Sequence, residues 1–228
     1  MTDTLEICVD RPDDLAIAIS ANVDRIELCS ALDLGGLTPT PGLIALAKNS
    51  DVPIYAMIRP RGGNFIYTEA ELCSMELDVA AMRAAGFAGV VFGAAKDDQT
   101  LDIVALKRLC VAAKGMGMTL HRVVDEMSSP RDAVDTAIDL GIERILTSGG
   151  ASTAVEGIDE LSAMVELAGA EIEVMAGSGV TFSNISLLRH AKISSFHASC
   201  RVKNSEDQNP SLDVGVLSKT LKAVLRTG

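Results

Sequence analysis

The sequence predicts an α/β fold, a single (β/α)8 barrel of the TIM type that occupies residues 1–228 as one domain. Three observations predict this fold class. Eight short apolar runs recur along the chain, helical patterns separate them, and no Pro/Ser-rich linker divides the 228 residues. A complete series of eight strand and helix units favours a closed barrel, because an open doubly wound sheet usually has fewer strands.

The strands are expected at short runs rich in apolar or β-branched residues, several of which end in polar side chains. They cover residues 5–9, 25–29, 54–58, 89–92, 118–121, 144–147, 172–175 and 195–198.

Helix start and stop signals fill the intervals between these runs. A polar residue stands before a proline at residues 10–12, 40–41 and 129–130, and both residue types suit the first turn of a helix. Gly141 ends the helix that begins at Pro130.

A capping box predicts the start of the central helix. Thr68 and Glu71 have the required spacing, apolar residues follow at helical intervals, and Gly86 closes the helix. A second apolar stripe near the C-terminus, at residues 214–224, completes the alternation.

Composition excludes several classes of partner. Hydrophobic residues make up 48% of the chain and charged residues 22%, which is ordinary for a globular protein with a sizeable core. The net charge of −11 argues against nucleic acid and anionic membranes. The N-terminus is acidic where a signal peptide is basic, and no uncharged run reaches membrane-spanning length, so we expect a cytoplasmic protein.

Five cysteines are spread through the chain without the close spacings of a disulfide scaffold or a zinc site, so we expect reduced thiols. Cys73 and Cys110 fall on predicted helices and fit the role of small buried hydrophobes.

The first two strands carry a possible metal site. Side chains alternate along a strand, so Glu6 and Cys8 share one side of the first strand, as Glu27 and Cys29 do on the second. If these sides face the barrel interior, Cys8 and Cys29 lie near its mouth, where two thiols could hold copper(I). The alternative is a pair of unreactive thiols that fill the upper barrel.

The third strand runs into Arg59 and Arg61, which are separated by one proline and followed by two glycines. Guanidinium groups at a strand end suit a carboxylate or phosphate ligand. They could equally pair with Glu6, Glu27 and Asp125 as a structural ion network, and both roles can coexist.

Histidines are expected at the same mouth. The fifth strand delivers His121 and Arg122, with Asp125 nearby to orient the imidazole for proton transfer. His197 ends the eighth strand, which closes beside the first. His190 lies on a predicted helix and is expected at the surface.

Glycine-rich loops follow the sixth and seventh strands, and the second leads into a helix that is expected to begin near Thr181. Their backbone amides could cradle an anion, as the last loops of such barrels often do, although such glycines also serve as plain tight turns. The anion-binding candidates are Ser148, Gly149, Gly177, Ser178, Gly179, Ser199 and Arg201.

Eight ordered segments, LEICVD, DRIELCSALDLGGLTP, MIRPRGG, VVFG, HRVVDEM, RILTSG, VMAGSGV and FHASCR, together resemble the copper homeostasis protein CutC family over residues 5 to about 201. The resemblance implies a TIM barrel, a role in copper handling, and copper binding by thiols such as Cys8 and Cys29. HRVVDEM departs from the expected HRAFDM, and AGSGV from the commoner AGGGV.

Three hypotheses follow from these residues. The first is a cytosolic protein that binds copper(I) through Cys8 and Cys29. The second is a metal-independent enzyme for a small anionic metabolite, such as a phosphorylated one, with Glu6 or Glu27 as acid or base and His121 sharing the proton work. The third is a vestigial site in a protein that acts through the surfaces of a homo-oligomer. The sequence leaves open whether the protein is an enzyme and names no cofactor besides copper.

Overall fold

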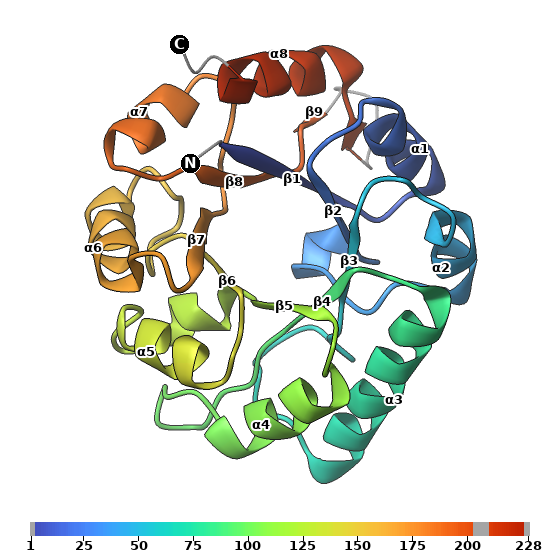
Figure 1. Ribbon diagram of the computed structural model, residues 1–228, viewed down its shortest axis with the longest axis vertical. Helices are drawn as coiled ribbons and strands as arrows, with labels where there is room; N and C mark the ends of the chain where they lie inside the picture. The colour runs from blue at the N-terminus through green and yellow to red at the C-terminus, as the bar shows by residue number, and fades with distance from the viewer. Residues whose placement is uncertain (1–2, 203–209, 226–228) are drawn as a thin grey trace.

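Eight parallel strands close into a barrel that helices surround, which confirms the predicted fold class. The computed structural model describes residues 3–202 and 210–225. Figure 1 shows the strands as an inner ring, with the first strand beside the last. That residues 1–228 form one domain stays a prediction, because residues 1–2, 203–209 and 226–228 lie outside the described part. No described helix has both the length and the apolar character needed to cross a membrane.

The strands follow the predicted runs to within about a residue at most ends. They are β1 (Thr4–Val9), β2 (Arg25–Leu28), β3 (Ile54–Met57), β4 (Gly89–Phe92), β5 (Gly117–Leu120), β6 (Arg144–Thr147), β7 (Glu173–Ala176) and β8 (Ser195–Ala198). A short hairpin of β9 (Arg201–Val202) and β10 (Ser211–Leu212) follows the barrel and was not predicted.

The outer helices begin near the predicted signals. They are α1 (Pro12–Ser20), α2 (Pro41–Ala47), α3 (Glu69–Ala85), α4 (Ile103–Ala112), α5 (Asp132–Asp139), α6 (Ile158–Ala168), α7 (Ile185–His190) and α8 (Val214–Leu225). The Thr68 capping box forms at α3, and Gly86 closes that helix with a φ of 80°.

Two helix starts differ from expectation. The N-cap of α1 is Arg11 rather than Asp10, because the Asp10 carboxylate instead accepts a hydrogen bond from the Leu32 amide and pairs with Arg201. α5 begins at Asp132, two residues after Pro130, because residues 130–131 form a turn before the helix.

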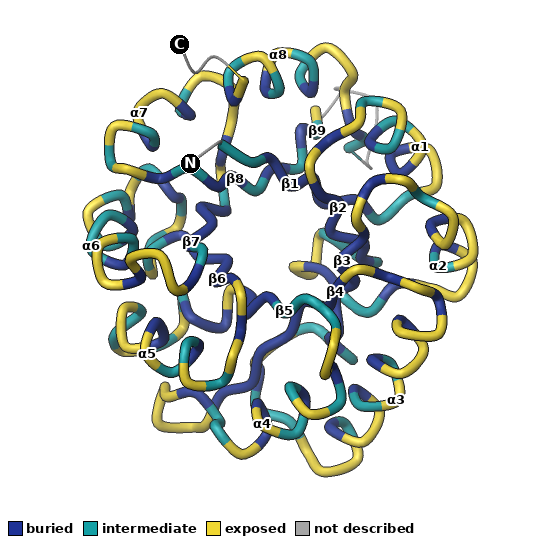
Figure 2. Tube along the Cα trace, in the orientation of Figure 1, coloured by how far each residue is buried: buried dark blue, intermediate teal, exposed yellow. Residues whose placement is uncertain are grey.

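Strand alternation separates two sets of buried side chains. Outward residues such as Ile7 and Ile26 pack under the helices in the main core, whereas Cys8, Cys29 and Met57 belong to a separate buried cluster. Figure 2 shows the buried strands at the centre and exposed helix surfaces outside. The polar sides of β1 and β2 therefore face the barrel interior, which is where a functional site would need them.

The cysteines are free, but their burial differs from expectation. Cys8, Cys29 and Cys200 are buried, Cys110 is half-buried and Cys73 is exposed. Cys73 is therefore not the buried hydrophobe that its position on a helix suggested. It lies on the solvent side of α3 beside Glu69 and Arg108.

Candidate functional site

A cavity of about 750 Å³ opens at the C-terminal ends of the strands, where barrel enzymes and binding proteins place their sites. Most of the predicted site residues line it, but Glu6, Cys29, Arg61, Ser148, Gly149 and Gly177 do not. The predicted residues in its lining are Cys8, Glu27, Arg59, His121, Arg122, Asp125, Ser178, Gly179, His197, Ser199 and Arg201.

The stagger of the barrel sets which side chains meet. Cys8 on β1 stands opposite Glu27 on β2, and Glu6 stands opposite Arg25 on one side and His197 on the other. Glu6 and Glu27 are on neighbouring strands as expected, yet they are not level with one another. The residue directly across from Cys8 on β2 is therefore Glu27 and not Cys29. Cys29 lies nearer the C-terminal end of the barrel, where its amide donates a hydrogen bond to the Val9 carbonyl.

A largely buried chain of charges runs below the mouth. The Glu6 carboxylate accepts from Arg25 Nε at 2.7 Å and contacts His197 Nδ1 at 2.9 Å. Burial alone would raise the pKa of Glu6, but the hydrogen bond to His197 and the charge of Arg25 lower that pKa to about 2. Glu6 is therefore a permanent anion that orients the His197 ring.

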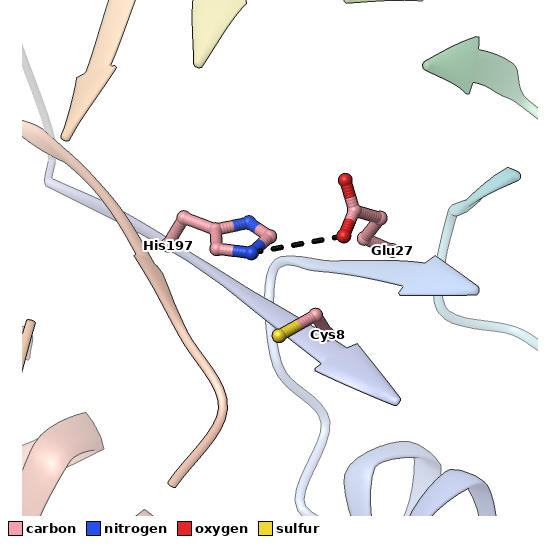
Figure 3. Close-up of side chains that lie close together, drawn as sticks. All are labelled: Cys8, Glu27 and His197. Carbon is pink, nitrogen blue, oxygen red and sulfur yellow. Dashed lines mark ion pairs between the residues drawn. The ribbon is translucent and has the colours of Figure 1, made fainter. Parts of the chain in front are cut away.

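The other side of the same ring faces Glu27, as Figure 3 shows. His197 Nε2 lies 3.7 Å from Glu27 Oε2, and the Cys8 thiol lies beside both. Burial opposes a charged ring, but Cys8, Glu27 and Glu6 together raise the pKa of His197. Burial also raises the pKa of Glu27.

Sulfur atoms gather on the adjacent wall. Cys8, Cys29 and Met57 share a buried cluster with Tyr55 and Val91, hereafter the sulfur cluster. The Cys29 thiol lies 3.5 Å from Glu27 Oε2, and burial together with the Glu27 charge raises the pKa of Cys29 well above its ordinary value. Sequence reasoning missed Met57, whose place on the inward side of β3 was the only available signal.

The two arginines after β3 have separate roles. Arg59 is buried and donates to the carbonyl groups of Leu34, Gly36 and Gly63, which fixes its guanidinium at the cavity wall. Arg61 instead pairs with Glu71 at 2.5 Å and does not line the cavity. The expected pair of ligand-facing arginines is thus reduced to one, because the α3 capping box holds the other.

His121 is buried against Phe65, with ring centroids 4.6 Å apart. Its Nδ1 accepts a hydrogen bond from the Val123 amide, so the neutral ring carries its proton on Nε2. Burial and the charge of Arg59 lower the pKa of His121 to about 3. His121 is thus a neutral donor rather than a cation.

The Asp125 carboxylate accepts hydrogen bonds from backbone amides in the loop that the sequence predicted to bind an external anion. Its carboxylate accepts from the amides of Ser148 and Gly150 and pairs with Arg122 at 2.7 Å, while the Gly149 amide donates to Thr147 Oγ1. Among the described residues, no hydrogen bond or ion pair joins the Asp125 carboxylate to His121. It orders the loop after β6 instead of the imidazole.

The loop after β7 is held as a turn, and α7 begins at Ile185 rather than near Thr181. The Asn184 side chain accepts from the Thr181 amide and donates to the Gly179 carbonyl, which delays the helix. The Gly177 amide donates to Thr147, and the Ser178 hydroxyl donates to Ser152. Anion binding at this loop stays a prediction. The loop does not lead directly into a helix N-terminus, because α7 begins only at Ile185.

The last rim residues differ from each other. Ser199 lines the cavity, while Arg201 pairs with Asp10 and lies 3.6 Å from Asp14. This arginine therefore ties the segment after β8 to the start of α1 as well as reaching the cavity.

The barrel floor holds charged residues that sequence reasoning also missed. Arg25 and Arg144 both pair with Glu173 and both lie over the Tyr55 ring, at 5.6 and 5.1 Å. Strand alternation could have identified Arg25, which shares a side with Glu27.

Comparisons with known proteins agree with one another. The profile of the CutC family matches residues 3–202. A "family protein CutC" from Rhizobium meliloti (strain 1021) is 52% identical over 198 residues, 86% of this chain and 81% of that protein. One from Vibrio campbellii is 43% identical over 203 residues, 87% of this chain and 82% of that protein.

Solved structures with the same barrel fold also align with this chain. The CutC protein from Streptococcus agalactiae, whose description assigns it provisionally to copper homeostasis, aligns with a TM-score of 0.82 at 31% identity, covering 87% of this chain and 99% of that one. KGPDC from Streptococcus mutans aligns with a TM-score of 0.65 at 13% identity over 99% of both chains, which shows a shared fold alone.

Proposed function

The chain belongs to the CutC family, and we propose that it is a cytosolic copper homeostasis protein that binds copper(I) through thiols at the barrel mouth. The observation that carries this proposal is the sulfur cluster, in which Cys8, Cys29 and Met57 gather on one buried wall. Thiolate and thioether ligands select copper(I) over harder ions. The free cysteines suit a reducing compartment.

The residues fit copper(I) by their softness and their burial. An added Cβ at Gly36 would lie 3.4 Å from both Cys29 Sγ and Met57 Cε, so the two sulfur side chains flank one spot. The raised pKa of Cys29 means that its thiol proton must leave when copper(I) binds. Cys8 provides the link to the cavity, from which the ion would enter.

An anaerobic competition titration with a copper(I) chelator tests the proposal. The Cys8→Ser/Cys29→Ser double variant should lose most of the copper(I) affinity, and Met57→Leu should lose less because a thioether is the weaker ligand. Cys73→Ser is the matched control, since Cys73 is an exposed thiol outside the barrel. Unchanged affinity in the double variant would sink the thiol site.

A second candidate function is an enzyme for a small anionic metabolite. Three buried N–H groups of cavity residues have no acceptor among the described residues, namely Arg59 Nε, His121 Nε2 and Arg201 Nε. Buried donors without acceptors are costly, so a ligand rich in oxygen would satisfy them. Glu27, with its raised pKa, stands in the same cavity as a candidate acid or base.

Screening of anionic metabolites by thermal shift and turnover tests this second candidate. A substrate should stabilise the protein, and its turnover should disappear in Glu27→Gln while binding persists. If no compound in the pool binds, the enzyme hypothesis loses its support and the copper proposal is unaffected.

A further inference from the structure

Three different donor atoms converge beside the sulfur cluster. Cys8 Sγ, a ring nitrogen of His197 and a carboxylate oxygen of Glu27 all lie within 4.8 Å of one another. They come from β1, β8 and β2, and Figure 3 shows the ring and the carboxylate facing each other with the thiol beside them. The side chains of Glu27 and His197 are only 3% and 11% exposed. The convergence is therefore internal to the barrel.

The histidine is already oriented as metal-binding histidines are. Its Nδ1 is engaged by Glu6 at 2.9 Å, which leaves Nε2 directed toward Glu27. Glu6 is itself held by Arg25. A carboxylate on the far nitrogen fixes the tautomer and the orientation of a ligating imidazole.

The Glu27 carboxylate is only partly satisfied by hydrogen bonds. Glu27 Oε1 is buried and has no hydrogen-bond partner among the described residues. The Cys8 thiol donates only a long hydrogen bond, of 3.7 Å, to the Ala198 carbonyl, and it also contacts the His197 ring. A buried carboxylate oxygen without a partner is costly, and a cation between the three donors would satisfy it.

The mixture of donors selects the class of ion. One sulfur, one nitrogen and one oxygen suit Zn²⁺, whereas Mg²⁺ and Ca²⁺ prefer oxygen alone and copper(I) prefers sulfur. All three residues line the cavity, so a fourth coordination position would face its solvent. Three protein ligands with an open fourth position are typical of zinc sites that bind water or a ligand.

We propose that Cys8, Glu27 and His197 form a binding site for Zn²⁺, with Glu6 as the positioning residue for His197. Binding replaces the protons of the Cys8 thiol and His197 Nε2, which leave to solvent. The site shares Cys8 with the sulfur cluster, but it uses neither Cys29 nor Met57. It therefore goes beyond the copper proposal and does not depend on it.

A chelator competition titration with Zn²⁺ on the full-length reduced protein tests the site. One ion should bind per chain, and affinity should fall steeply in Cys8→Ser, Glu27→Gln and His197→Gln. Glu6→Gln should cost about 10- to 100-fold, as loss of an outer carboxylate does. Cys73→Ser is the matched control and should keep the parent affinity, because its thiol is exposed on α3. Circular dichroism and melting curves check that each variant is folded.

Cobalt(II) supplies a readout that folding defects do not mimic. Co²⁺ at this site should give visible ligand-field bands together with a thiolate charge-transfer band. The charge-transfer band should disappear in Cys8→Ser and remain in Cys29→Ser. A spectrum without a thiolate band in the parent protein would overturn the assignment.

The variants separate this site from the copper proposal. If Zn²⁺ affinity is unchanged in Glu27→Gln and His197→Gln, or if no Zn²⁺ binds at a one-to-one ratio, the mixed-donor site is wrong. Neither result touches copper(I) binding, which Cys29→Ser and Met57→Leu test. Conversely, if copper(I) affinity is unchanged in Cys8→Ser/Cys29→Ser, the copper proposal is wrong. That result does not contradict the zinc site.

Discussion

At the scale of the residue, charged neighbours decide the charge state of each histidine at the mouth. His121 and His197 both lie in the cavity lining, yet their pKa values move in opposite directions. His121 has Arg59 as its charged neighbour, whereas His197 lies between Glu6 and Glu27. The barrel therefore holds one neutral donor and one ring that favours positive charge.

His121 should make the stability of the protein dependent on pH. Its folded pKa of about 3 is below the ordinary 6.5, so the neutral ring contributes stability that is present above pH 6.5 and lost as the pH falls toward 3. Between pH 7.5 and 5.5, the parent protein should lose about 1.4 kcal/mol more of its free energy of unfolding than His121→Gln does. Urea unfolding at several pH values measures this difference.

His190→Gln is the matched control for that measurement, because it removes an imidazole from the exposed end of α7. If the curve of His121→Gln stays parallel to that of the parent protein, the buried ring is not neutral in the folded state.

Residue types at the mouth could be predicted from the sequence, but their partners could not. Asp125 was expected to orient a histidine, and it fills the amides after β6 instead. Arg61 was expected at the ligand, and it serves the start of α3. Strand alternation places a side chain on the inner side. Which neighbour it meets depends on loop geometry, which a local pattern does not contain.

At the scale of the element, the signals that the sequence carried were those of local hydrogen bonding. The capping box at α3 is an example, because its two reciprocal hydrogen bonds lie within four residues, Thr68 to Glu71. The start of α7 was missed because Asn184 delays it through contacts with the preceding loop.

Loss of the α3 cap should destabilise the protein. Thr68→Ala leaves the Glu71 amide without its side-chain acceptor, which should lower the free energy of unfolding by about 1 kcal/mol. Ser74→Ala, at an exposed interior position of the same helix, should be neutral or slightly stabilising because alanine is the better helix former. Equal effects of both substitutions on urea midpoints would contradict the capping role.

Two glycines make room for an aromatic ring inside the barrel. An added Cβ at Gly89 would lie 2.2 Å from Tyr55 Cε1 and 2.7 Å from the Gly117 carbonyl oxygen, and one at Gly117 would lie 2.2 Å from Tyr55 Oη. Gly89→Ala should therefore cost about 1 to 3 kcal/mol or more. Gly42→Ala is the control and should not destabilise, because Gly42 is exposed on α2 and an added Cβ would meet only Thr40 Oγ1, at 4.0 Å.

The clash itself can be tested by a double variant. Tyr55→Leu combined with Gly89→Ala should cost less than the sum of the two single changes, because the smaller side chain vacates part of the space. Strict additivity in thermal or urea unfolding would assign the cost of Gly89→Ala to the backbone rather than to the ring.

At the scale of the whole molecule, closure of the barrel brings its first and last strands together. β1 pairs with both β2 and β8, so Cys8, Glu27 and His197 meet only when the last strand docks on the first. The number and order of the strands could be predicted from periodicity. The stagger that sets Cys8 level with Glu27 rather than Cys29 could not, because it follows from the tilt that closes a barrel.

An ion at these three residues should therefore stabilise the entire barrel rather than one loop. Free Zn²⁺ at 100 times its dissociation constant should add about 2.7 kcal/mol to the free energy of unfolding. For a chain of this size that corresponds to a rise in melting temperature of roughly 5 to 11 °C. Glu27→Gln should abolish the rise and Cys73→Ser should keep it, because only the first removes a donor that joins β2 to β8. A rise that survives Glu27→Gln but disappears in Cys73→Ser would locate the stabilising ion at the exposed thiol on α3, away from the seam between the first and last strands.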